Sequence, residues 1–206
     1  MKKNIQLSNN TLLVSELENE DKDIFELLSL LEEYVFDNAS FSMCALNDIV
    51  KQCCKAMDEV DDELEKAERI INEIYIEHMF IENEPRYWSM SACELHPSIT
   101  NRHISPALKS MVISYILSEC GFDSDIVFVP EKLMVRIICN DVYAIIFDPI
   151  TGESLNGYEL DQKLEDVNND PQKQELYSLS KQEVFVNHIT VMKAALIREK
   201  RYSEAF

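Results

Sequence analysis

The sequence predicts an α+β fold, with an N-terminal helical bundle, a central buried helix on a small three-stranded antiparallel sheet, and a C-terminal helix. Two patterns of apolar residues within the 206-residue sequence support this prediction. Apolar residues recur at helical spacing as far as about residue 84, and three short segments rich in Val, Ile and Phe follow between residues 125 and 147. The apolar share of 46% is typical of a globular chain rather than a disordered one.

Residues 1–84 are predicted to form an acidic helical subdomain. Three helices are expected there, one beginning at Asp23, one from Phe41 to Met57 and one from Asp61 to Ile81. This part contains 21 acidic and 7 basic residues, so it carries −14 of the total net charge of −19. Such an acidic face suits a basic protein partner, or serves solubility alone.

Residues 85–178 are predicted to form the α+β core. Ser105 and Pro106 favour the start of a helix, and Gly121 favours its end just after Cys120. Because apolar residues cover more than one face of this helix, we expect it to be buried. Strands are expected at 125–129, 133–139 and 142–147, a turn at 148–152 and a short helix at 158–167.

Two capping-box patterns predict further helix starts. Ser91 and Glu94 favour a short helix that ends at Pro97. Ser180 and Glu183 favour the start of a C-terminal helix, which fills the third predicted part of the chain, residues 179–206.

Glycine content and charge exclude several classes of function. The three glycines, Gly121, Gly152 and Gly157, do not have the spacing of the glycine-rich loops that bind phosphates. A net charge of −19 argues against nucleic acid and anionic membranes as partners. The sequence has neither an apolar segment of transmembrane length nor a secretory signal, so we expect a cytoplasmic protein.

The six cysteines do not have the spacing of a metal site. None of them forms C-x-x-C or a zinc-knuckle pair. We expect reduced thiols that are mostly buried, with no bound metal and no other cofactor.

Three segments carry a resemblance to a known family. They are Asn101–Leu108, Val127–Ile137 and Phe147–Leu155. They resemble a helix start, a strand and an Asp-Pro-Phe-x-Gly turn of the bacterial SirB family, which is transglutaminase-like. The resemblance covers about residues 40–206. The sequence departs from the family pattern at Ile104, where the family has glycine. The resemblance implies a transglutaminase-like, papain-like core and a C-terminal helix similar to the start of a tetratricopeptide-like region.

The resemblance also implies where a catalytic triad would lie. Catalysis needs a cysteine at the start of the central helix, a histidine on a following strand and an aspartate on the next. The superfamily's spacing, 15 residues before Gly121, puts the cysteine position at Pro106, and the histidine position falls on Lys132. Only Asp148 matches. We therefore expect the triad to be degenerate and the protein not to be an enzyme.

The predicted function is a non-catalytic, cytoplasmic protein-interaction or regulatory module with an unidentified protein partner. Two alternatives remain open. A small anionic ligand would use the degenerate cleft, where Lys132 supplies the positive charge. A cryptic cysteine hydrolase or acyltransferase would use Cys93 with His96 or His103. The oligomeric state is left open.

Three further side chains have predicted structural roles. His78 lies on the apolar stripe of a helix and is expected to be a satisfied core histidine. His188 is expected on the surface of the C-terminal helix. Arg136 is expected to pair with Asp148 or with another acid.

Overall fold

The computed structural model describes residues 15, 16, 19, 23–36, 43–129, 132–141, 143–155 and 176–205. These residues belong to two compact units, each of which is built from separate stretches of the chain. One unit combines residues 43–86 with 106–179, and the other combines residues 1–42, 87–105 and 180–206. The predicted subdomain limits near residues 84 and 178 stay a prediction.

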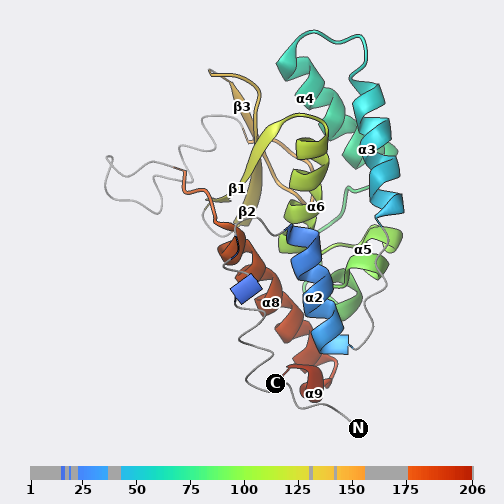
Figure 1. Cartoon of the computed structure of the whole chain (residues 1–206), viewed down its shortest axis with the longest axis vertical. Coiled ribbons are helices and arrows are strands. Elements are labelled where there is room, and N and C mark those ends of the chain that lie inside the picture. The colour runs from blue at the N-terminus through green and yellow to red at the C-terminus, as the bar shows by residue number, and fades with distance from the viewer. Residues whose placement is uncertain are drawn as a thin grey trace. The chain divides into compact units, whose positions relative to one another are not determined.

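The first unit contains the predicted antiparallel sheet (Figure 1). Its strands are β1 (Asp123–Val129), β2 (Lys132–Ile138) and β3 (Ala144–Phe147), in the order β1-β2-β3. Val127 lies opposite Met134 in the first pair of strands, and Val135 lies opposite Phe147 in the second. The mixed fold and the sheet are confirmed, and each strand begins within two residues of the expected position.

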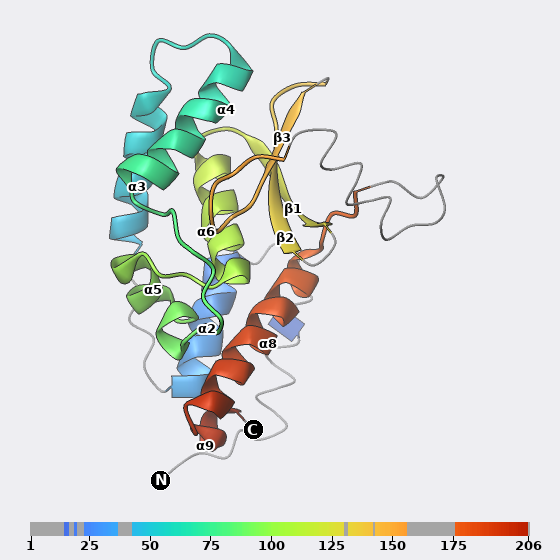
Figure 2. The same cartoon turned by 180° about the vertical axis from the view of Figure 1, so that it is seen from behind.

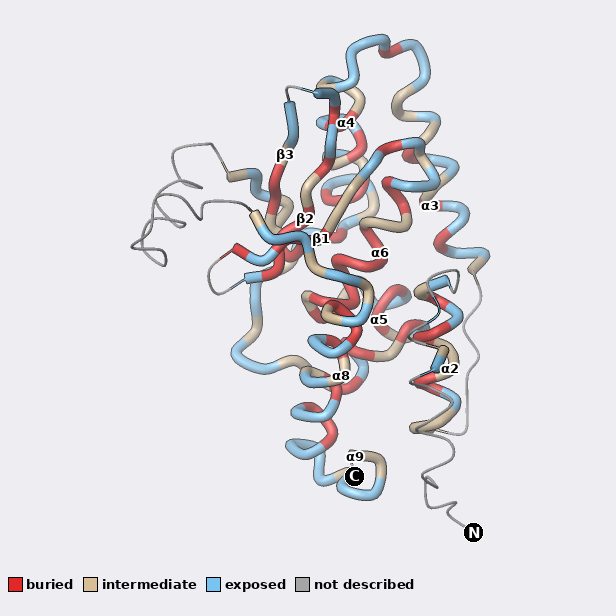
Figure 3. Tube along the Cα trace, turned by 60° about the vertical axis from the view of Figure 1, so that its left-hand side comes forward, coloured by how far each residue is buried: buried red, intermediate tan, exposed pale blue. Residues whose placement is uncertain are grey.

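The central helix α6 (Pro106–Glu119) packs on β1 and β2 (Figure 2). It is buried along most of its length (Figure 3), and Leu108, Val112 and Ile116 have no exposed surface. The helix ends as predicted, because Gly121 takes a φ of 86° and Phe122 N–H donates to the Leu117 carbonyl over 2.9 Å. The expected serine cap is wrong, since Ser105 Oγ accepts no hydrogen bond from the first turn.

Two further helices of the same unit pack against each other, and the first of them also packs on α6. They are α3 (Cys44–Ala56) and α4 (Glu63–Asn72), and Asp62 caps α4 by accepting a hydrogen bond from Glu65 N–H over 2.9 Å. The expected single α-helix over 61–81 is wrong. After Asn72 the chain continues as a short π-helix, η1 (Glu73–Glu77), which buries Ile74 and Tyr75.

The second unit is helical. Its elements are α2 (Ile24–Phe36), the 3₁₀-helix η2 (Met90–Ala92), α5 (Leu95–Asn101), α8 (Lys181–Arg198) and α9 (Tyr202–Ala205). The capping box of Ser180 and Glu183 is confirmed at the start of α8. The box predicted at Ser91 is wrong, because Ser91 lies inside η2 and Glu94 is the N-cap residue of α5. Pro97 ends no helix, because it lies in the first turn of α5, where it loses no helical hydrogen bond.

Two other predictions fall outside the described residues, the helix at 158–167 and the position of Gly157. Within the described part of the chain, no helix combines the length and the apolar character that a bilayer span requires.

Candidate functional site

The three positions of the predicted degenerate triad all lie in the unit that holds the sheet. Pro106 is the first residue of α6, Lys132 is the first residue of β2, and Asp148 follows β3 directly. Lys132 Nζ lies 3.2 Å from Asp148 Oδ2 and 3.1 Å from Glu84 Oε2. The structure thus joins two of the three positions by an ion pair. Pro106 contributes only its carbonyl, which accepts a hydrogen bond from Ser110 Oγ over 2.9 Å.

One ammonium is therefore shared by two carboxylates at this position. The hydrogen bond to Glu84, together with the one to Asp148, raises the pKa of Lys132 above its ordinary value. Asp148 is also engaged through its other oxygen, Oδ1, which accepts a hydrogen bond from Ile150 N–H over 2.7 Å. The local charge is negative and Lys132 stays protonated, so Lys132 acts here neither as a neutral base nor as an unpaired cation.

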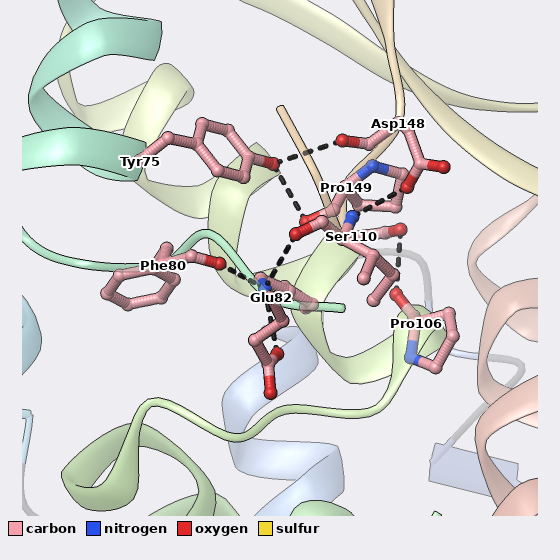
Figure 4. A network of polar contacts seen from close by, with 9 residues as sticks. Tyr75, Phe80, Glu82, Pro106, Ser110, Asp148 and Pro149 are labelled. Carbon is pink, nitrogen blue, oxygen red and sulfur yellow. Dashed lines mark hydrogen bonds and ion pairs between the residues drawn. The ribbon is translucent and has the colours of Figure 1, made fainter. Parts of the chain in front are cut away.

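A buried lysine lies one turn into α6. Lys109 has no exposed side-chain surface, and its Nζ donates to Glu82 Oε2 over 2.9 Å (Figure 4). The same ammonium donates to the carbonyls of Phe80 and Ile150, the latter over 3.3 Å. Burial lowers the pKa of Lys109, and Glu82 opposes part of this decrease. Three acceptors thus satisfy the three donors of one ammonium in the interior.

Tyr75 of η1 holds the same turn as Lys109 does. Its hydroxyl donates to the carbonyl of Pro149 over 2.8 Å (Figure 4), and burial raises its pKa well above the usual range. Gly152, with a φ of 76°, lies against the ring, and a Cβ there would come within 2.6 Å of Tyr75 Cγ. The turn after β3 is therefore fixed by a tyrosine, a lysine and the carboxylate of Asp148.

Sequence reasoning missed both Lys109 and Tyr75. A signal for Lys109 existed, because it is the only charged residue between Pro106 and Ser118, in a helix predicted to be buried. A charge on such a helix needs partners in the interior. No comparable signal marked Tyr75, since an aromatic residue on an apolar stripe is ordinary core.

The predicted substitute site, with Cys93, His96 and His103, lies in the other unit. Cys93 is fully buried, and burial raises the pKa of its thiol to about 11, while a hydrogen bond to Ser105 lowers it only in part. The charged groups that act on this thiol are Glu199, Glu94 and Arg198 rather than a histidine.

Neither histidine of the substitute site is placed like a catalytic base. His96 is exposed on α5, and His103 stacks on the ring of Trp88 with 5.2 Å between ring centroids. Within the described part of the chain, no group of three or more His, Cys, Asp or Glu residues is arranged to hold a metal ion.

Three other predicted side chains have clear outcomes. Arg136 pairs with an acid as expected, Asp125 of β1, over 2.8 Å between Nε and Oδ1. His78 is largely buried, with Nε2 3.7 Å from a carboxylate oxygen of Glu73. The surface position expected for His188 is wrong. Its side chain has no exposed surface and neither ring nitrogen has a hydrogen-bond partner, because its face of α8 turns inward with Phe185 and Met192.

All six cysteines are free thiols. Cys53, Cys93 and Cys139 are buried, Cys44 is exposed, and the sulfur atoms of Cys54 and Cys120 lie 3.3 Å apart.

The comparison with protein families decides what this core is. The model of the transglutaminase-like superfamily matches residues 43–189. The chain belongs to this superfamily. The matched range contains α6, the sheet and the predicted triad positions, and it begins at Met43, just before α3. No curated protein and no solved structure matches the chain.

Membership in the transglutaminase-like superfamily allows residues of this chain to be compared with the catalytic groups of the superfamily. The start of α6 and the edges of β2 and β3 are where the superfamily resemblance places a nucleophile, a base and an orienting acid. At the positions predicted to correspond, this chain has Pro106, the paired ammonium of Lys132 and the carboxylate of Asp148 that pairs with it.

Proposed function

We propose that this protein is a non-catalytic, SirB-type transglutaminase-like domain that acts as a protein-interaction or regulatory module in the bacterial cytoplasm. One observation carries the proposal. The nucleophile position holds Pro106, and the ammonium at the base position, Lys132, is held 3.2 Å from Asp148, where an imidazole would be oriented in an active relative.

The chemistry of acyl transfer supports the same conclusion. The reaction needs a thiolate or alkoxide to attack the carbonyl carbon and a neutral base to take its proton. Pro106 has no such atom, and the carboxylates of Glu84 and Asp148 keep Lys132 protonated. The surviving aspartate then serves the fold, by pairing with Lys132 and closing its own turn at Ile150.

The two alternatives have weaker support. An anionic ligand would meet two carboxylates beside one ammonium, and Lys132 and Asp148 are in direct contact, which leaves no room between them. A hydrolase built on Cys93 would need a thiolate, whereas burial keeps that thiol protonated at neutral pH. The C-terminal pair α8 and α9 fits the first helix and turn of a tetratricopeptide-like region, a surface type that binds proteins.

Activity assays test the proposal. We expect the wild-type protein to incorporate no dansylcadaverine into casein and to hydrolyse no p-nitrophenyl ester above the buffer rate. The variants D148N and C93S serve as matched controls. Turnover by the wild type that is lost in either variant would overturn the proposal.

A second experiment tests whether Pro106 and Lys132 mark the triad positions. In the double variant P106C/K132H, a histidine beside the new thiol should lower the pKa of that thiol. We expect it to react with iodoacetamide at least about tenfold faster than the thiol in P106C alone. Equal rates, in variants whose circular dichroism matches the wild type, would place the triad positions elsewhere.

A further inference from the structure

A groove of about 350 Å³ opens on the unit that holds the sheet, between α4, η1, β3 and the turn at 151–154. It shares Tyr75 with the buried network but contains none of the triad positions. Its walls are largely apolar and are formed by Ile71, Ile76, Ile81 and Ile145. Ile76 and Ile81 are 55% and 56% exposed, so two large apolar side chains of the groove face solvent.

The charged groups of the groove all have one sign. Glu68 and Glu153 line it, and no lysine or arginine does. Neither carboxylate forms an ion pair or hydrogen bond within the described part of the chain. The two bases on α4 are already paired, Arg69 with Glu65 over 2.8 Å and Lys66 with Glu63 over 2.6 Å. The groove therefore offers two uncompensated negative charges beside an apolar surface.

The floor of the groove is fixed before anything binds. Gly152 lies against the ring of Tyr75, whose hydroxyl is tied to Pro149. A preformed apolar surface loses little conformational freedom on binding, which favours affinity.

These features select the kind of occupant. Sites for small molecules enclose most of the ligand, whereas more than half of Ile76 and of Ile81 faces solvent. An open surface of this kind fits side chains that a second protein presents. From the apolar walls and the two free carboxylates, we infer that the groove binds a segment of a partner protein in which lysine or arginine alternates with leucine-like residues. This inference rests on the proposed interaction function and names the chemistry of its partner.

A model peptide tests the inference on the full chain. The probe is a fluorescein-labelled 14-residue peptide of leucine and lysine, at 150 mM salt, and a peptide with glutamate in place of lysine is its control. Binding is followed by fluorescence anisotropy and located by amide chemical shifts. We expect the shifts to gather at the residues that line the groove, and the glutamate peptide not to bind.

Matched variants separate specific binding from attraction to the net charge of −19. E68Q/E153Q removes two charges in the groove, and D58N/D123N removes two exposed charges outside it. We expect the first to weaken binding about five- to tenfold and the second to change it less than about twofold. I81S should weaken binding as well, because it removes an apolar wall while its exposed position spares the fold.

Equal losses in the two double variants, or shifts centred elsewhere, would overturn the inference. A partner protein that binds the E68Q/E153Q and I81S variants as tightly as it binds the wild type would also overturn the inference. That second outcome would leave the proposed interaction function standing, whereas the activity assays test the proposed function independently.

Discussion

Lys109 Nζ lies 2.9 Å from a carboxylate oxygen of Glu82, and no part of the lysine side chain is exposed. A buried ion pair of this kind gains little over an apolar pair of the same shape, but its two halves depend strongly on each other. Removing the lysine takes one donor from Glu82 and from the carbonyls of Phe80 and Ile150, of which the Ile150 carbonyl keeps its hydrogen bond from Glu82 N–H over 3.0 Å. The pair is thus a point where a single substitution has a large effect.

The variant K109M should lower the free energy of unfolding by about 3–5 kcal/mol, since it removes the ammonium that pairs with a largely buried carboxylate. K109M/E82Q should recover part of this loss, because the charge left behind is gone. Urea denaturation followed by circular dichroism measures both. A K109M protein as stable as the wild type, or a double variant less stable than K109M, would contradict the structure.

His188 should make the protein less stable in mild acid. Burial lowers its pKa from 6.5 to about 4, so the unfolded chain binds a proton that the folded chain does not. Its contribution is complete above about pH 6.5 and is lost as the pH falls toward 4, by up to about 3 kcal/mol. H188L should remove this slope, because leucine does not titrate. The substitution breaks no hydrogen bond, because neither ring nitrogen has a partner to lose. The exposed His96, replaced by Gln, is the control and should leave the slope unchanged.

Glu32 should act in the opposite direction. Burial raises its pKa from 4.5 to about 7, although a hydrogen bond from Leu95 N–H, 2.5 Å long, lowers it in part. The folded state therefore favours the protonated acid, and its contribution falls as the pH rises from about 4.5 to 7. E32Q keeps an acceptor for Leu95 and should be more stable than the wild type at pH 8 by up to about 3 kcal/mol. E33Q, at the exposed neighbouring carboxylate, should show no such gain in urea titrations at pH 5 and 8.

Cys93 should be among the least reactive thiols of the chain. With a pKa of about 11, less than about 0.1% of it is thiolate at pH 7.5, and its sulfur is buried. Peptide mass spectrometry after brief treatment with iodoacetamide should show Cys44 labelled and Cys93 unlabelled in the folded protein. Labelling of Cys93 at the rate of Cys44 would revive the hydrolase alternative.

Local sequence patterns predicted much of the fold. The helix from Pro106 to its stop at Gly121 and the Val- and Ile-rich strands were predictable because proline, glycine and β-branched residues act through their own backbone preferences. The capping box at Ser180 succeeded for the same reason. The triad positions at Pro106, Lys132 and Asp148 came from the family resemblance and stay a prediction, beside which the structure places an ion pair between Lys132 and Asp148.

Tertiary contacts decided the features that the sequence did not reveal. Apolar spacing continues through 61–81, so only the packing of Tyr75 on the turn after β3 reveals the π-helix. His188 lies on a helix with apolar residues on several sides, and the sequence alone does not say which side faces inward. Lys109 was missed because its partners are distant in sequence. Two of them are backbone carbonyls, which no pattern of side chains indicates.

The network around Lys109 has a kinetic consequence. Its ammonium joins carbonyls that are 29 and 41 residues away along the chain, so both intervening loops must close before it forms. Contacts of this kind are expected late in folding, after the barrier, and they then act on the unfolding rate rather than the folding rate. In K109M we expect the unfolding arm of the chevron to move and the folding arm to stay. The buried lysine would then govern how long the native state persists once formed, rather than how quickly it is reached.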